Sequence, residues 1–144
     1  MGEGMPLIRL ARVLPWLGLL LWTALPVQAQ GERFNDEPVI ARGKTLFQEH
    51  CAVCHGANAQ GIDQNWHRPD ENGRYPPPPL NGTAHTWHHS MEVLAQVIRK
   101  GTLEWGGSMP AWEETLDDDD VFSLIMYLSS LWPDEIYQAW LKRN

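Results

Sequence analysis

The sequence lacks several features that mark common structural classes. It contains only two cysteines, which lie three positions apart, so neither is left over for a second disulfide or metal site. No internal repeat, alternating strand pattern or βαβ pattern is present. Basic residues are also scarce, because 11 Lys and Arg stand against 18 Asp and Glu, which gives a net charge of −7. This balance disfavours binding to nucleic acid or to anionic lipid.

The chain also lacks a long uninterrupted apolar run. Its most apolar stretch, within residues 13–27, is short for a membrane span and is broken by Pro15 and Pro26. Arg9 and Arg12 precede it, and small residues end it near position 29. We therefore expect residues 1–29 to be a cleaved secretory signal and the protein to be periplasmic or otherwise exported. An uncleaved membrane anchor through residues 13–27 is the alternative.

The most informative motif uses both cysteines. Cys51, Cys54 and His55 form the order Cys-x-x-Cys-His, which is the attachment signature of c-type haem. Two thiols at this spacing on a helical turn can each form a thioether with a haem vinyl group, and the adjacent imidazole can bind the iron. A redox dithiol, half of a zinc site and a plain disulfide are the competing interpretations.

The remainder of the chain indicates a single small helical domain. Apolar residues at helical spacing predict helices over 38–50, 90–100, 118–132 and 134–142. The connection 56–79 is rich in Gly, Asn, Asp and Pro and is long for a compact domain, so we expect it to wrap a bulky group. The predicted fold class is all-α, with three to five helices around one covalent haem in residues 38–144, after a flexible segment over 30–37.

Four consecutive aspartates, 117–120, mark the start of the third predicted helix. Asp117 is a good N-cap, and the following carboxylates lie where the helix dipole favours negative charge. Leu116 and Val121 occupy the two positions of a hydrophobic staple. A calcium site is the alternative explanation of the acidic run.

The order of these features resembles class I cytochrome c over residues 38–131. In addition to the haem-attachment motif, Gly43 and Phe47 occupy the family's Gly-x-x-x-aromatic position on the first helix. The resemblance implies that the last helix crosses there, close to Tyr127. It also implies one covalent haem c, with Cys51 and Cys54 as its attachment points.

The same resemblance assigns further pocket residues. Pro78 and Leu80 fall in a segment that resembles the family's Pro-x-Leu-x-Gly loop, where the proline carbonyl accepts the Nδ1 proton of the proximal histidine. Trp87 resembles a family tryptophan that binds a haem propionate. Met109, followed by Pro110, lies where the family places its second axial ligand, so His55 and Met109 are the expected iron ligands.

Other residues could compete for these roles. Met91 and Met126 lie on amphipathic helices and are expected to fill the core. His50 is expected to be a solvated surface residue, and His67 lies in the long loop. Two groups of residues each have two interpretations. The histidines could bind a second metal or cover the haem propionates with polar side chains; they are His85, His88 and His89. Trp105 and Trp112 could bind propionates or pack in the core.

Three functions are compatible with these features. The first is a one-electron carrier, not itself an enzyme, because two axial ligands leave the iron no open position. The second is a catalytic or sensing haem subunit of a dehydrogenase or oxidase complex, with a displaceable sixth ligand. The third is a metal-handling protein that uses His85, His88 and His89. For the first, the acidic composition predicts redox partners with a basic docking patch, no nucleic acid, and contact with a membrane only if the N-terminal segment is uncleaved.

Overall fold

The computed structural model describes residues 1–2 and 31–144. The predicted secretory signal lies almost entirely outside the described residues, and the alternative anchor over 13–27 lies entirely outside them. Within the part of the chain that is described, no helix has the length and apolar character needed to cross a membrane.

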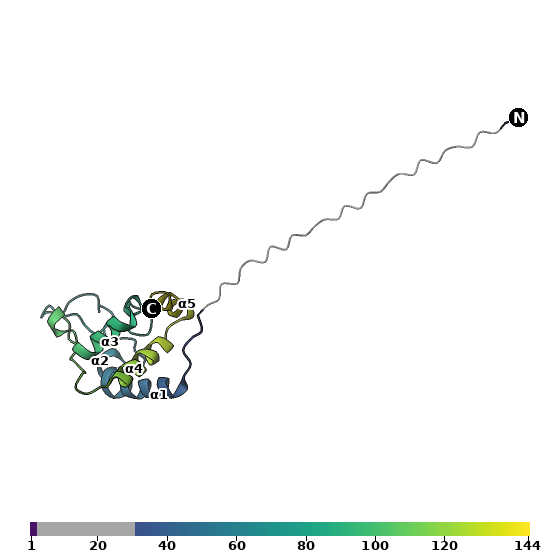
Figure 1. The fold of residues 1–144 in the computed structure, drawn as a ribbon. Helices are drawn as coiled ribbons and strands as arrows, with labels where there is room; N and C mark the ends of the chain where they lie inside the picture. Colours follow the sequence, from purple (N-terminus) through teal and green to yellow (C-terminus); the bar gives the residue numbers. More distant parts are fainter. Residues whose placement is uncertain (3–30) are drawn as a thin grey trace.

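Helices form all the regular secondary structure of residues 31–144 (Figure 1). In chain order they are α1 (Glu37–Leu46), the π-helix η1 (Phe47–Cys51), α2 (Ala52–His55), the 3₁₀ helix η2 (Thr86–His88), α3 (Met91–Lys100), the 3₁₀ helix η3 (Leu103–Trp105), α4 (Asp118–Ser130) and α5 (Asp134–Leu141). This confirms the predicted all-α class, with five α-helices in the described residues.

The first predicted helix differs from the structure at its C-terminal end. Instead of stopping near residue 50, α1 widens into η1 and continues through α2 to His55. The amide of Ala52 donates to the carbonyl of Phe47, which is the bond pattern of a π-turn. Gly56, with φ +79°, ends α2. One continuous helical segment therefore delivers the two cysteines and His55.

The start of α4 matches the sequence prediction. Asp117 accepts a hydrogen bond from the Asp120 amide at 2.8 Å, and the Asp120 carboxylate accepts one from the Asp117 amide. This is a reciprocal capping box built from two aspartates. Leu116 and Val121 are both buried. The capping box and the acidic first turn account for the run of aspartates as residues that stabilise the start of α4. The described residues contain no group of three or more His, Cys, Asp or Glu that could hold a metal ion.

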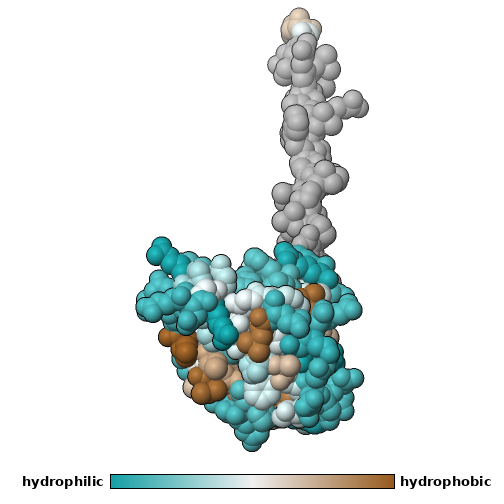
Figure 2. Space-filling model, turned by 90° about the vertical axis from the view of Figure 1, so that its left-hand side faces the viewer, coloured by the Kyte–Doolittle hydropathy of each residue, from teal (hydrophilic) through white to brown (hydrophobic). Residues whose placement is uncertain are grey.

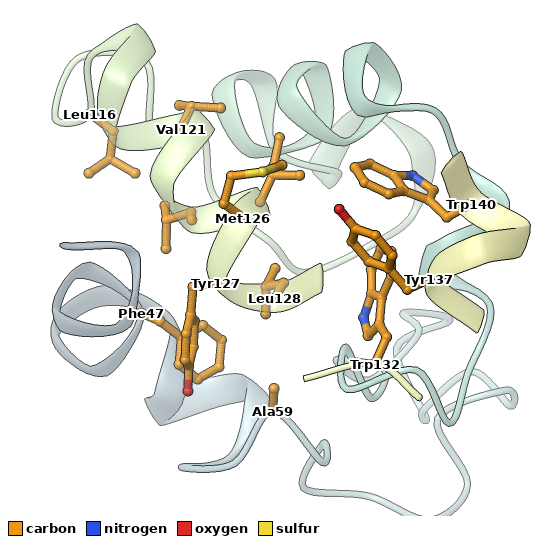
Figure 3. Close-up of a cluster of buried hydrophobic side chains, with 12 residues drawn as sticks. Phe47, Ala59, Leu116, Val121, Met126, Tyr127, Leu128, Trp132, Tyr137 and Trp140 are labelled. Atoms are coloured by element: carbon orange, nitrogen blue, oxygen red, sulfur yellow. The ribbon is translucent and has the colours of Figure 1, made fainter. Parts of the chain in front are cut away.

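The core is built around α4, which is buried along most of its length (Figure 3). On one side α4 packs against α1, where the rings of Phe47 and Tyr127 lie 5.5 Å apart between centroids. On the other side Trp132, Tyr137 and Trp140 close the core. Met126 is buried here and Met91 packs at the edge, as expected of core methionines.

The crossing of α1 and α4 depends on the missing side chain of Gly43. A Cβ atom added at Gly43 would overlap the carbonyl of Ser123 and would lie 2.8 Å from the Cβ of Tyr127. Only glycine lets the two backbones approach this closely. The predicted contact between Gly43 and Tyr127 is thus confirmed, and Ser123 is an additional neighbour on α4.

The segment before α1, described from residue 31, contacts the last two helices through Arg33. Arg33 donates to the carbonyls of Ser129 and Trp132 at 2.9 and 3.0 Å and pairs with Asp134 at 2.7 Å. Its guanidinium also lies 4.2 Å from the centroid of the Tyr137 ring. Because these bonds satisfy carbonyls at the end of α4, they fix the entry of the chain against the last two helices.

Replacing Gly43 with alanine tests the helix crossing. Helix propensity alone would favour alanine by about 1 kcal/mol. The overlap with the Ser123 backbone cannot be relieved by a rotamer change, so we expect Gly43→Ala to lower the free energy of unfolding by about 1–3 kcal/mol in chemical denaturation. Thr45→Ala, at an exposed position of the same helix, is the control and should be close to neutral. An unchanged or higher stability for Gly43→Ala would contradict the close crossing.

Candidate functional site

The two cysteines lie at the junction of η1 and α2 and form no disulfide with each other. Cys51 is half-buried and Cys54 is exposed. Burial, and to a lesser extent the neighbouring Cys54, raises the pKa of the Cys51 thiol to about 11. Cys51 is therefore a neutral thiol near pH 7, and Cys54 is open to a reaction partner from solvent.

His55 is buried directly beside the thiols, with 8% of its surface exposed. Its Nδ1 lies 3.0 Å from the carbonyl oxygen of Pro78. Since a carbonyl can only accept, Nδ1 carries the proton and Nε2 keeps its lone pair. Burial lowers the pKa of His55, and this outweighs the opposite effect of the Pro78 bond. The imidazole is thus neutral, oriented, and able to bind a metal through Nε2.

The loop that carries Pro78 is held by hydrogen bonds to the main chain of the residues that follow it. The amides of Leu80 and Asn81 both donate to the carbonyl of Ala59, at 2.7 and 3.2 Å. The indole Nε1 of Trp132 donates to the carbonyl of Leu80 at 2.8 Å. The sequence analysis did not identify Trp132, because a contact across 52 residues leaves no local signal.

Met109 lies half-buried in the loop between η3 and α4. Its carbonyl accepts a hydrogen bond from the Thr102 amide at 2.9 Å, which closes residues 102–109 into a compact loop. Beyond it, the amides of Trp112 and Glu113 donate to the carbonyl of Arg99, at 3.1 and 3.2 Å. The segment that follows Met109, residues 110–113, is therefore held along the C-terminal end of α3.

The tryptophans and His50 differ in part from the sequence predictions. Trp87 is half-buried between the His88 ring, at 3.9 Å, and Arg143, at 5.6 Å, and its Nε1 makes no hydrogen bond within the described residues. Trp105 is 61% exposed, so it is not a core residue. His50 is not simply solvated, because its ring lies 5.2 Å from that of Trp112, which is half-buried.

The histidine cluster does not form a metal site of three ligands in the described residues. His85 stacks on Trp66 at 5.3 Å and contacts the His89 ring at 5.6 Å, whereas His88 packs on Trp87. Burial, and then the charges of His89 and His88, lower the pKa of His85. The backbone of this histidine segment contacts α5, because the indole Nε1 of Trp140 donates to the His89 carbonyl at 2.9 Å.

Several apolar side chains in the segments that carry the cysteines and the methionine are exposed. Val53 between the cysteines, Ile62 in the loop after His55, and Leu103 after Thr102 are all more than half exposed. Figure 2 shows uncovered apolar side chains, interspersed with polar ones, on the face that is at the left in Figure 1. Free thiols, an oriented neutral imidazole and exposed apolar side chains together fit a large apolar prosthetic group such as haem.

Comparisons with known proteins agree with this site. A family model described as cytochrome c oxidase, cbb3-type, subunit III matches residues 38–128. The cbb3-type cytochrome c oxidase subunit CcoP of Azospirillum brasilense is 36% identical over 100 residues, covering 69% of this chain and 31% of that protein. Subunit FixP of Bradyrhizobium sp. (strain ORS 278) is 31% identical over 91 residues, covering 63% of this chain and 27% of that protein.

A shorter relative matches over most of its own length. Cytochrome c6 of Cladophora glomerata is 29% identical over 94 residues, which cover 65% of this chain and 89% of that protein. The match thus spans less than a third of each oxidase subunit but nearly all of cytochrome c6. No solved structure matches the chain significantly.

The helical fold and the Cys-x-x-Cys-His site define a class I c-type cytochrome. Within that class the chain belongs to the family described as cytochrome c oxidase, cbb3-type, subunit III. Its cofactor is covalently bound haem c, and the domain is of the electron-transfer kind.

Removing either thiol tests the attachment site. We expect Cys51→Ala and Cys54→Ala each to leave at most one thioether bond, with poor maturation and a large loss of covalently bound haem, as measured by mass spectrometry of the denatured protein. Val53→Ala, at the exposed position between them, is the matched control and should retain the full haem mass. Folded wild-type protein without haem mass would contradict the assignment.

Proposed function

We propose that this chain is a one-electron carrier in which His55 and Met109 are the axial ligands of the haem iron. In this proposal Cys51 and Cys54 anchor the haem, while Leu80 and Trp87 contribute to its pocket. The observation that carries the proposal is the hydrogen bond from His55 Nδ1 to Pro78, because it presents a neutral imidazole Nε2 beside the two thiols. A buried histidine with a purely structural role would not need two free thiols next to it.

The haem, when bound, supplies the exchange between ferrous and ferric iron. The chain's own residues would keep the same iron ligands in both oxidation states. The Pro78 carbonyl accepts the Nδ1 proton, which fixes the ring orientation and makes Nε2 a better donor. As a ligand, the thioether of Met109 would favour the reduced state and raise the reduction potential. If His55 and Met109 both bound the iron, no position would be left for a substrate, and we infer transfer of electrons without catalysis.

The acidic surface supports a proposal about partners. The segment 1–29 contains Glu3, Arg9 and Arg12, a net charge of +1, so its removal changes −7 to −8. Such a charge would steer the protein toward a basic patch on a redox partner and away from nucleic acid. The CcoP and FixP relatives are named as subunits of a cbb3-type cytochrome c oxidase. We therefore propose that this chain exchanges electrons with an oxidase complex of that type, outside the cytoplasm.

A methionine-to-leucine exchange tests the second axial ligand. Met109→Leu keeps the size of the side chain but removes the thioether. We expect loss of the charge-transfer band of the ferric protein, a lower reduction potential, and new binding of carbon monoxide to the ferrous protein. Met126→Leu, a volume-conserving exchange in the core, is the control and should leave the spectrum unchanged.

The wild-type spectrum separates this function from its main alternative. If the wild-type protein already binds carbon monoxide and lacks the charge-transfer band, the sixth position is open or displaceable. The protein would then be assigned as a catalytic or sensing haem subunit and not as a one-electron carrier. An unchanged band in Met109→Leu would instead show that another residue is the ligand.

A further inference from the structure

Both main-chain polar groups of Met109 are bonded to one residue, Thr102. The Thr102 amide donates to the Met109 carbonyl at 2.9 Å, and the Met109 amide donates to the Thr102 hydroxyl oxygen at 3.1 Å. One bond uses only the main chain and would survive any substitution except proline. The other depends on the threonine side chain, in a partly buried position.

The Thr102 hydroxyl has no competing local role. Thr102 occupies the N-cap position of η3, where a hydroxyl often accepts a bond from its own helix. In this structure no such capping bond forms, and the same oxygen accepts from Met109 seven residues away. The hydroxyl thus serves the methionine segment rather than the short helix that follows it.

Two glycines make this arrangement sterically possible. Gly101 has φ +70°, and a Cβ added there would lie 2.5 Å from the Met109 carbonyl oxygen. A Cβ added at Gly107 would overlap the Thr102 hydroxyl. The loop backbone is therefore packed around the Thr102 side chain on one side and against the Met109 main chain on the other.

We propose that Thr102 is the positioning residue for the sixth ligand of the haem iron. Thr102 forms hydrogen bonds with both the amide and the carbonyl of Met109. These bonds fix the orientation of the peptide planes on either side of Met109, which determine the direction in which its side chain leaves the backbone. This inference rests on the proposed axial role of Met109. Without the hydroxyl, the partly buried Met109 amide lacks a partner, and the loop spends more time in conformations in which the thioether is off the iron.

The test compares Thr102→Val, which keeps the shape but loses the acceptor, with Thr102→Ser, which keeps the acceptor. In the ferric holoprotein, imidazole competes with Met109 for the iron, so its apparent affinity reports how often the ligand is released. We expect Thr102→Val to bind imidazole about five- to thirtyfold more tightly than the wild type. It should also have a lower reduction potential and faster hydrogen exchange at the Met109 amide.

The control variants separate the hydroxyl from general loosening. Thr102→Ser should restore the wild-type imidazole affinity, potential and exchange rate. Thr45→Val, which removes a hydroxyl bonded to the Ala41 carbonyl on α1, should not change any of the three. If valine prevents folding, Thr102→Ala removes the same acceptor without adding bulk, and the same comparison with serine applies.

Two results would overturn the inference in distinguishable ways. Wild-type imidazole affinity and amide exchange in Thr102→Val, together with loss of the charge-transfer band in Met109→Leu, would refute the role of Thr102 and leave the proposed function intact. A wild-type charge-transfer band in Met109→Leu would show that Met109 is not an axial ligand, and the proposed role of Thr102 would then fail as well.

Discussion

The hydrogen bond between His55 Nδ1 and the Pro78 carbonyl is the constraint on which the site depends, because it joins residues 23 positions apart. On one side, the continuous segment of α1, η1 and α2 delivers the histidine and the thiols together. On the other side, the Pro78 loop is held through Leu80 by Ala59 and Trp132. A carbonyl that moved by an ångström would lose this bond, so the surrounding bonds maintain the imidazole's tautomer and direction.

The two axial candidates are held by different physical means. His55 is buried, and its orientation follows from one bond on the ring itself. Met109 has no polar side-chain atom of comparable strength, so hydrogen bonds can hold it in place only through its main chain. Thr102 bonds both the amide and the carbonyl of Met109, and the end of α3 holds the residues that follow, Trp112 and Glu113. This difference explains why one proposed ligand is recognisable from a compact motif, whereas the position of the other depends on a loop that folds back on itself.

Much of the fold follows from local sequence, but several contacts at the site do not. The helix cap at Asp117 could be predicted because capping chemistry acts over a few residues. The glycine at the crossing was predicted from the resemblance to class I cytochrome c, because its partners on α4 are about 80 residues away. The π-turn before Cys51 was missed, because a single widened turn leaves apolar spacing almost unchanged. Trp132 and Arg33 were missed for another reason: each donates to backbone carbonyls 52 to 99 residues away, and any residue type can provide a carbonyl.

The distribution of contacts along the chain also sets the order in which parts of the domain can form. The helix that α1 packs against begins only at Asp118, and Arg33 finds its partners at Ser129 and beyond. Contacts at such separations form late, because closing long loops is entropically unfavourable. During synthesis from the N-terminus, Cys51 and Cys54 therefore emerge well before the chain that will bury the core. Throughout that interval both thiols belong to an open polypeptide, accessible to chemistry that the finished fold would restrict.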